Sequence, residues 1–383
     1  MKATARRLES VQEYYFSRKL REVAQRLKAG QPIINMGIGS PDLPAHPSVL
    51  KGLEKALSHP RAHMYQSYQG LPELREAISE FYKTHYQVTL DPDSEVLPLM
   101  GSKEGIMHIS LAFLNPGDQV LIPNPGYPTY VAVTRLVEAE AVFYALDETH
   151  NWQPNFEALE QLDTSKVKIM WVNYPHMPTG TEADPTTFDR LISWAKQRDI
   201  LLVNDNPYSF VLTDKPQSIL SRPGSKDVAI ELNSLSKSFN MAGWRVGMLS
   251  GKARFIQAVL KVKSNMDSGM FYGIQQGAIA ALKMDQSWFD ELNQIYRRRR
   301  ALVEVLAQRL GAQFDSNSVG LFVWAKLPPE ALDSESYIDK ILDEQHLFIT
   351  PGTIFGTQGE GYIRFSLCVP EETIEEVIKR FDS

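Results

Sequence analysis

The chain has 383 residues, of which 46 are acidic and 40 basic, so its net charge at neutral pH is −6. The length predicts one large and one small domain, and a hydrophobic content of 43% excludes a chain that is disordered throughout. The acidic balance argues against a nucleic-acid partner, which would require a basic field. The lack of any run of about 18 apolar residues argues against a membrane span. The single cysteine, Cys368, excludes intramolecular disulfides, and the N-terminus lacks the features of a signal peptide, so we expect a cytoplasmic protein.

Between residues 96 and 250, short apolar runs alternate with stretches of helical periodicity. This alternation predicts a mostly parallel sheet with helices on both faces. Ligands of such sheets bind beyond the carboxyl ends of the strands, so the residues that follow each strand matter most. The predicted strands are Val96–Met100, Gln119–Ile122, Ala141–Tyr144, Lys168–Val172, Ile200–Val203, Ala229–Leu232 and Val246–Leu249, with helices at Glu104–Leu114, Tyr127–Val137 and Pro185–Arg198.

The last hundred residues follow a different pattern, which predicts a smaller α+β domain. One long helix over Ser287–Gly311 contains the basic run Arg297–Arg300, which we interpret as a solvated helix face beside an apolar stripe. We expect residues 1–44 to join this smaller domain and residues 45–285 to form the large one. The other predicted elements are the strand Gly320–Ala325, a helix at Ser334–Gln345, the strand Tyr362–Val369 and a terminal helix at Glu371–Asp382.

Chemically useful residues follow three of the predicted strands. Ser102 and Lys103 begin a helix after a glycine, where free backbone N–H groups can hold a phosphate. Asp205 follows another strand, and Lys237 follows a third, between hydroxyl residues. Each feature has an ordinary structural reading, such as a turn or a helix cap. Together they predict a pyridoxal-phosphate site, in which the lysine forms a Schiff base and the carboxylate faces the pyridine nitrogen.

Motif-like segments run through nearly the whole chain. They are Gly37–Asp42, Tyr65–Arg75, Asn124–Pro128, Ser234–Lys237 with Gly243–Gly247, and Gly361–Ser366. In this order they resemble the motifs of the class I and II aminotransferases, which are pyridoxal-phosphate enzymes of fold type I. The resemblance is closest to the branch that contains LL-diaminopimelate aminotransferase and related alanine or aspartate aminotransferases. It implies a seven-stranded, mostly parallel sheet with helices on both faces, and a smaller α+β domain.

The resemblance also implies a role for each matching residue. Lys237 would hold the cofactor as a Schiff base and later move the substrate proton as general base and acid. Asp205 would pair with the pyridinium nitrogen, Tyr127 would stack on the ring, and Tyr208 would hydrogen-bond its phenolic oxygen. The groups implied for the phosphate are the N–H groups of Ser102 and Lys103, the hydroxyls of Ser234 and Ser236, the guanidinium of Arg245, and Tyr65 from a neighbouring subunit.

Tyr65 in that role implies a homodimer with its sites at the subunit interface. For the substrate, the resemblance assigns the α-carboxylate to Arg364 and to the backbone of Gly39, with Tyr14 or Tyr15 as a further contact. A guanidinium matches a carboxylate with two parallel hydrogen bonds, which a lysine cannot offer. Alternation along the strand places Arg364 on the face opposite Ile363 and Phe365. A surface arginine on an amphipathic strand is the alternative interpretation.

Met177 departs from the family pattern, because related chains usually carry asparagine before Pro178-Thr179-Gly180. That asparagine donates a hydrogen bond to the phenolic oxygen of the cofactor, and a methionine cannot. We therefore expect the pKa of the Schiff base to be higher than in a Met177→Asn variant. Asn173 and His176 lie nearby in the sequence, but the sequence does not show that either replaces the donor.

The predicted reaction moves an amino group from an L-amino acid to a 2-oxo acid, with 2-oxoglutarate as acceptor by family habit. A C–S β-lyase or a decarboxylase would use the same residues, because the cofactor performs the difficult chemistry. A non-catalytic ligand-binding relative is the alternative from another class. No metal site is predicted from the eight histidines. The donor amino acid stays open among alanine, aspartate, diaminopimelate, methionine and the aromatic amino acids.

Overall fold

A computed structural model describes residues 4–9, 13 and 15–381 of the chain. Its main element is a seven-stranded sheet with the strand order β2-β8-β7-β6-β5-β3-β4. β8 runs antiparallel to both of its neighbours and the other pairs are parallel, so the predicted mostly parallel sheet is confirmed. Its strands are β2 (Val96–Leu99), β3 (Gln119–Asn124), β4 (Glu140–Ala145), β5 (Val167–Val172), β6 (Leu201–Asp205), β7 (Ala229–Ser234) and β8 (Gly247–Gly251).

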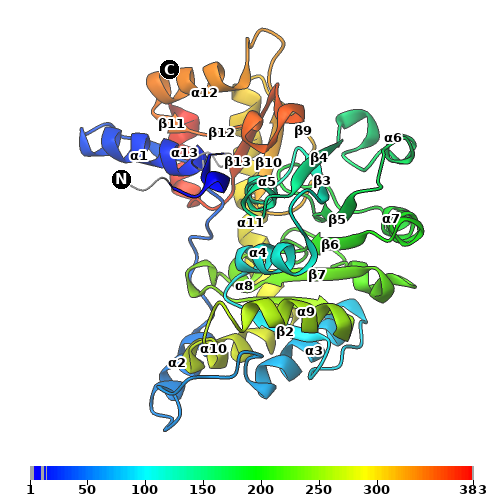
Figure 1. Cartoon of the computed structure of the whole chain (residues 1–383). Helices are drawn as coiled ribbons and strands as arrows, with labels where there is room; N and C mark the ends of the chain where they lie inside the picture. The colour runs from blue at the N-terminus through cyan, green and yellow to red at the C-terminus, as the bar shows by residue number, and fades with distance from the viewer. Residues whose placement is uncertain (1–3, 10–12, 14, 382–383) are drawn as a thin grey trace.

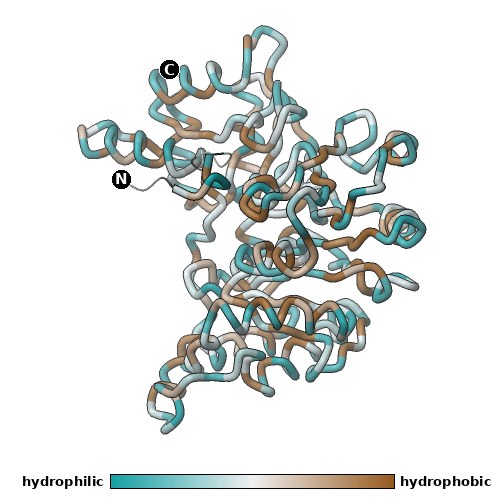
Figure 2. Tube along the Cα trace, in the orientation of Figure 1, coloured by the Kyte–Doolittle hydropathy of each residue, from teal (hydrophilic) through white to brown (hydrophobic). Residues whose placement is uncertain are grey.

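Two hydrophobic cores lie against this sheet, and alternate residues of a strand belong to different cores. In β6, Leu202 belongs to one core while Leu201 and Val203 belong to the other. Because successive strand side chains point to opposite faces, this division places one core on each face. Figure 2 shows the apolar character concentrated along these strands. One core packs under α3 (Pro72–Tyr86), α7 (Pro185–Arg198) and α10 (Tyr272–Leu282), and the other under α4 (Ser102–Phe113), α5 (Pro128–Leu136) and α9 (Ala253–Lys263).

A second, antiparallel sheet lies in the upper part of Figure 1 with the order β12-β13-β10-β9. A third core fills the space between this sheet and the last helices. The chain crosses from α1 to α2 as an extended segment on the left of Figure 1, with the short strand β1 paired to β11. The remaining elements are α1 (Tyr15–Lys28), β1 (Ile34–Asn35), α2 (Pro47–Leu57), α6 (Phe156–Glu160), α8 (Leu235–Ser238), α11 (Gln286–Arg309), β9 (Gln313–Phe314), β10 (Phe322–Lys326), α12 (Ser334–Gln345), β11 (Leu347–Phe348), β12 (Thr350–Pro351), β13 (Tyr362–Ser366) and α13 (Glu371–Lys379).

The interpretation of the basic run in α11 as a solvated face is wrong for half of its residues. Arg299 and Arg300 are buried, while Arg297 and Arg298 are exposed. Arg299 donates two hydrogen bonds to the carboxylate of Asp42, at 2.7 and 2.8 Å, and a third to the carbonyl of Leu367. Arg300 contacts Ser318 and the carbonyl of Asp315. A local charge pattern carries no sign of partners that lie far along the chain, and these partners explain the burial.

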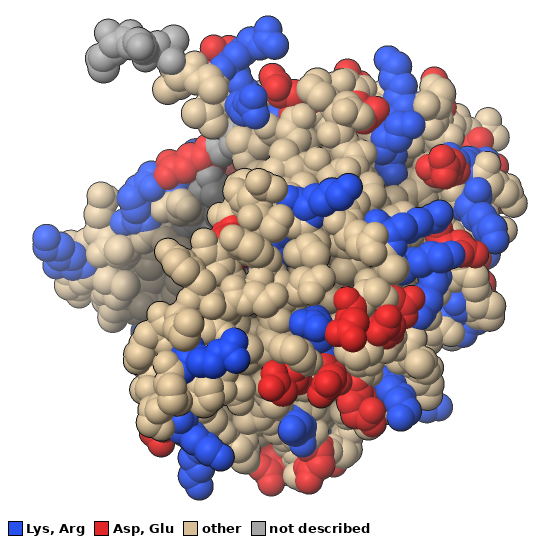
Figure 3. Space-filling view, turned by 60° about the horizontal axis from the view of Figure 1, so that its bottom comes forward, with Lys and Arg blue, Asp and Glu red and all other residues tan. Residues whose placement is uncertain are grey.

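The surface agrees with the charge balance of the sequence. Figure 3 shows lysine and arginine side chains interspersed with acidic ones on the face it presents, with no continuous basic patch there. Across the described ranges, no helix combines the length and the apolar character needed to cross a bilayer.

Candidate active site

A cavity of about 360 Å³ opens where the predicted strand ends meet. Ten of the twelve predicted site residues line it, and the other two, Arg245 and Tyr65, do not. The sheet explains the convergence, because β6 and β7 are adjacent and parallel and so end at the same edge. The ten lining residues are Gly39, Ser102, Lys103, Tyr127, Asp205, Tyr208, Ser234, Ser236, Lys237 and Arg364.

Lys237 projects into the cavity from α8, the single helical turn that follows β7. The hydroxyl of Ser234 caps this turn by accepting a hydrogen bond from the backbone N–H of Ser236. The ammonium of Lys237 donates to the carbonyl of Gly39 at 2.6 Å. Burial lowers the pKa of Lys237, and the nearby charges of Arg364 and Arg245 act in the same direction. A lowered pKa favours the neutral amine, which is the form of lysine that can act as a nucleophile.

Asp205 ends β6, is buried and lines the cavity. Its Oδ2 accepts a hydrogen bond from the hydroxyl of Tyr130 at 2.8 Å, while its Oδ1 is buried without a hydrogen-bond partner. Burial raises the pKa of Asp205 to about 6, although the bond from Tyr130 works against the rise. A buried carboxylate oxygen with an unused acceptor site is suited to a cationic N–H group of a ligand.

The start of α4 provides a place for an anion beside this carboxylate. Gly101 caps the helix with φ of 92°, a conformation that favours glycine, and a Cβ there would lie 2.2 Å from Arg245 Nη2. Arg245 is exposed and donates from Nη1 to the carbonyl of Ala242 and to the hydroxyl of Ser236. Thus the guanidinium of Arg245, although it does not line the cavity, lies against the N-terminus of α4. This arrangement of helix N–H groups, hydroxyls and a guanidinium fits a phosphate.

Taken together, the donors at α4, the unpartnered oxygen of Asp205 and the buried amine of Lys237 fit the phosphate, ring nitrogen and aldehyde of pyridoxal phosphate. The two tyrosines of the cavity complete the fit. Tyr127 immediately precedes α5 and Tyr208 lies against Phe322, with ring centroids 5.9 Å apart. Burial raises the pKa of both phenols, so both keep their hydroxyl proton at neutral pH.

Arg364 enters the cavity from the middle of β13, and it is buried rather than on the surface. Its Nη2 donates to the carbonyl of Gly37 at 2.7 Å. Its guanidinium lies 3.8 Å from the ring centroid of Phe322 and 4.7 Å from that of Phe355. These rings fix the plane of the guanidinium through cation–π contact. A substrate carboxylate could exchange with the neutral carbonyl, because charged acceptors make stronger hydrogen bonds.

The structure shows how Met177 and its neighbours are arranged. The Met177 sulfur lines the cavity 3.3 Å from Arg364 Nη1. Asn173 also lines the cavity, but its side-chain amide N–H is donated to the carbonyl of Asp205 and its oxygen accepts from the N–H of Met177. His176 is buried between Thr179 and the carbonyl of Pro125, and burial lowers its pKa to about 3. His176 is therefore not among the residues that line the cavity, and the side chain of Asn173 hydrogen-bonds to backbone groups.

Two predicted contacts stay away from the cavity within this chain. Tyr65 is 91% exposed, in the segment that precedes α3. Tyr15 starts α1 and is not among the lining residues, whereas Leu20, farther along the same helix, is. Tyr14 lies outside the described residues.

Sequence reasoning missed several residues that shape the site. Tyr130 lies three residues after Tyr127 on the first turn of α5, a helical spacing that predicts a shared face, and its bond to Asp205 follows from it. Phe322 and Phe355 gave no signal, because a single phenylalanine in an apolar stretch is expected in any core. Leu20, Ile38 and Pro207 complete the lining.

Comparison with known proteins agrees with this geometry. Residues 31–381 match the family of class I and II aminotransferases. LL-diaminopimelate aminotransferase of Dehalococcoides mccartyi is 43% identical over 379 residues, which covers 98% of this chain and 97% of that protein. A substrate-bound structure of BacF from Bacillus subtilis has a TM-score of 0.95 at 35% identity and covers 99% of this chain and 97% of the other. Aspartate aminotransferase of Thermus thermophilus shares the fold, with a TM-score of 0.92 at 24% identity, covering 100% and 99% of the two chains. This chain therefore belongs to the class I and II aminotransferases and has transaminase activity.

Proposed function

We propose that this aminotransferase uses LL-diaminopimelate as amino donor and 2-oxoglutarate as acceptor, with pyridoxal phosphate as its cofactor. The convergence of the Lys237 amine, the Asp205 carboxylate and the Arg364 guanidinium on one cavity is the observation that carries the proposal. The relative from Dehalococcoides mccartyi supports this choice of donor, because it is named an LL-diaminopimelate aminotransferase and the match covers nearly the full length of both chains. The choice of 2-oxoglutarate as acceptor rests on family resemblance.

The charge of the cavity also favours this donor. Arg364 is the arginine among the described lining residues, and no second one accompanies it there. Aspartate would bring a distal carboxylate that needs its own cationic partner. LL-Diaminopimelate ends in an ammonium and a carboxylate together, so its distal end has no net charge. We therefore expect the protein to prefer LL-diaminopimelate to aspartate.

Each residue then has a proposed task. When bound, pyridoxal phosphate supplies an electron sink for the carbanion formed at the substrate Cα. Lys237 Nζ takes the proton from the substrate Cα and delivers it to C4′, the cofactor carbon that carries the amino group. Asp205 holds the proton on the ring nitrogen, and Tyr127 and Tyr208 position the ring and its phenolic oxygen. Arg364 binds the α-carboxylate, helped by the backbone of Gly39.

The phosphate would be held by the remaining polar groups of the site. They are Ser102, Lys103, Ser234, Ser236 and Arg245, together with Tyr65 of a second subunit. Because the Tyr65 side chain projects from its own subunit, a homodimer with shared sites follows from this role. Exposed apolar side chains lie in the same segment and in the loop between α9 and α10 that packs against it, which suits a subunit interface; they are Met64, Tyr68, Met266 and Phe271.

We further propose that residues 45–285 form the large cofactor-binding domain, and that residues 1–44 and 286–383 form a smaller domain that closes over substrate. In support, α11 begins at Gln286, and the third core draws mostly on the C-terminal part of the chain. Closure of this kind would exclude water from the reacting carbon.

The deciding experiment is a set of half-reactions followed by near-ultraviolet and visible absorption of the protein loaded with pyridoxal phosphate. LL-Diaminopimelate should convert the spectrum to that of the aminated cofactor, and 2-oxoglutarate should restore it. Alanine, aspartate, methionine and aromatic amino acids serve as competing donors, and any of them reacting faster would replace the proposed donor. Release of pyruvate and ammonia without an acceptor would favour the β-lyase instead, and release of carbon dioxide the decarboxylase.

A further inference from the structure

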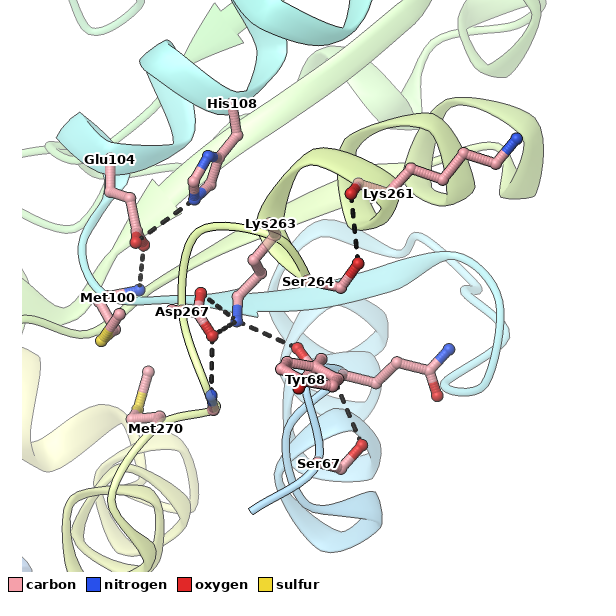
Figure 4. A network of polar contacts seen from close by, with 12 residues as sticks. Ser67, Tyr68, Met100, Glu104, His108, Lys261, Lys263, Ser264, Asp267 and Met270 are labelled. Carbon is pink, nitrogen blue, oxygen red and sulfur yellow. Dashed lines mark hydrogen bonds and ion pairs between the residues drawn. The ribbon is translucent and has the colours of Figure 1, made fainter. Parts of the chain in front are cut away.

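A buried ion pair lies outside the cavity, beneath the exposed patch around Tyr65. Lys263, the last residue of α9, contacts both carboxylate oxygens of Asp267, at 3.0 and 2.8 Å. Their side chains are only 3% and 5% exposed. The same ammonium donates to the backbone carbonyl of Tyr68 at 3.0 Å (Figure 4). Lys263 therefore joins the loop between α9 and α10 to the segment that carries Tyr65.

A second contact fixes the same two segments. The N–H of Gly269 donates to Asp267 Oδ1 at 2.8 Å. A Cβ at Gly269 would lie 2.5 Å from the carbonyl oxygen of Gln66 and 3.0 Å from that of Ser67, so only a glycine lets the backbones pack here. We call residues 64–68 together with residues 266–269 the arm, and the pair Lys263–Asp267 the clamp.

The clamp also borders the helix that starts at the proposed phosphate site. In Figure 4, Glu104 and His108 of α4 face Asp267. Ligand atoms of these three residues lie within 4.8 Å of one another, a spacing that a metal ion could use. The ammonium of Lys263 already balances Asp267 there, and Glu104 accepts the N–H of Met100. The cluster is thus an ion network in which lysine supplies the positive charge.

We propose that the clamp is a positioning device that acts in trans: it sets the arm of one subunit for use at the site of its partner. This inference rests on the homodimer of the proposed function. The clamped carbonyl belongs to Tyr68, three residues from Tyr65, and Tyr65 neither lines its own cavity nor is covered by its own subunit. A buried ion pair resists displacement, because moving one partner leaves the other charge uncompensated. The arm is therefore held in one position before a partner contacts it.

The test uses heterodimers in which one chain carries Lys237→Ala, so that a single site can hold the cofactor covalently. Two differently tagged chains are co-expressed and purified through both tags. The clamp is removed by the double change Lys263→Met with Asp267→Asn, which leaves no unpaired buried charge. The protein is diluted, and samples taken over time are treated with borohydride, which fixes any bound cofactor to Lys237. Mass spectrometry of the Lys237 chain then gives the rate at which the cofactor is lost.

With the clamp removed from the Lys237→Ala chain, the intact site should lose its cofactor about ten-fold faster, the effect of weakening one charged hydrogen bond. With the clamp removed from the Lys237 chain itself, the rate should stay within about two-fold. Tyr65→Phe on the Lys237→Ala chain should reproduce the acceleration, and adding the clamp change to it should give little more. The matched control is Lys226→Met with Glu95→Gln, which removes an ion pair outside the arm whose N–O distance is 2.7 Å. It should leave the rate of cofactor loss unchanged in whichever chain it is placed.

An equal or larger effect in the Lys237 chain would overturn the proposal, because the clamp would then act through α4 of its own subunit. No effect in either arrangement would overturn it as well, and so would a protein that sediments as a monomer. Circular dichroism and sedimentation establish that each heterodimer is folded and dimeric. The proposed function is judged separately by the half-reactions, since cofactor retention can be measured whether or not any amino acid reacts.

Discussion

Asp205→Asn tests the electrostatics of the site without any substrate. In the protein free of cofactor, burial raises the pKa of Asp205 to about 6 from its ordinary 3.8. The folded state therefore binds a proton at this carboxyl more tightly than the unfolded state does. Between these two pKa values the folded protein carries more protons, so its free energy of unfolding must fall as the pH rises.

The expected size follows from the two pKa values. A difference of roughly two pKa units corresponds to about 3 kcal/mol, at 1.36 kcal/mol for each unit. This stability is present below pH 4 and is lost as the pH rises through 6. The asparagine variant keeps the shape of the side chain but cannot ionise, so it should not show this loss. The unpartnered Oδ1 of Asp205 explains why the protein itself does not compensate the charge.

Urea unfolding of the cofactor-free protein and of Asp205→Asn, at one protein concentration and several pH values from 4 to 7, gives the comparison. The free energy of unfolding of the native protein relative to the variant should fall by about 3 kcal/mol over this range. Saturation with pyridoxamine phosphate should remove most of the decline, because a ring N–H⁺ then stabilises the carboxylate. A difference between the two proteins that stays constant with pH would refute the reasoning.

Three further changes test other parts of the site. Arg364→Lys should raise the KM for the donor by about ten-fold or more with a smaller change in kcat, because lysine loses the bidentate carboxylate contact; an unchanged KM would place the carboxylate elsewhere. Met177→Asn should lower the pH midpoint of the visible absorbance of the bound cofactor, since it restores a donor to the phenolic oxygen; an equal or higher midpoint would contradict this. Arg299→Met should lower the free energy of unfolding by about 2 kcal/mol, because it removes the hydrogen bonds from the guanidinium to Asp42 and to the carbonyl of Leu367, whereas Arg298→Met at an exposed position should cost less than about 0.5 kcal/mol. Equal losses in urea unfolding would refute the distinction.

The sequence predicted the large sheet well, because each of its strands carries a local apolar pattern. All seven predicted strands form in the structure, and the helices over 185–198 and 334–345 have the predicted bounds. The convergence of Ser102, Asp205 and Lys237 was also predictable, since parallel strands deliver their ends to one edge. The antiparallel direction of β8 was not predictable, because the length and composition of a strand do not specify its direction relative to its neighbours.

Long-range pairing explains what the sequence could not predict. Arg299 and Asp42 are 257 positions apart. The residues next to each of them along the chain do not indicate that the two will pair. The same is true of Lys263 and Tyr68, which are 195 positions apart. Each pair joins a charged side chain to a segment that has little regular structure of its own, and only the assembled fold brings the two together.

The segment from Gly37 to Asp42 shows how such pairing prepares a site for its substrate. Asp42 anchors the segment to α11 through Arg299, and the carbonyls of Gly37 and Gly39 accept hydrogen bonds from Arg364 and Lys237. These carbonyls are neutral acceptors, so they satisfy the two cations less strongly than a carboxylate would. Under the proposed function, the substrate carboxylate therefore displaces the Gly37 carbonyl from Arg364, and the release of Lys237 from Gly39 frees its amine for the reaction. In the proposed function, the anchored loop thus holds both cations in place until the substrate and cofactor take over their hydrogen bonds.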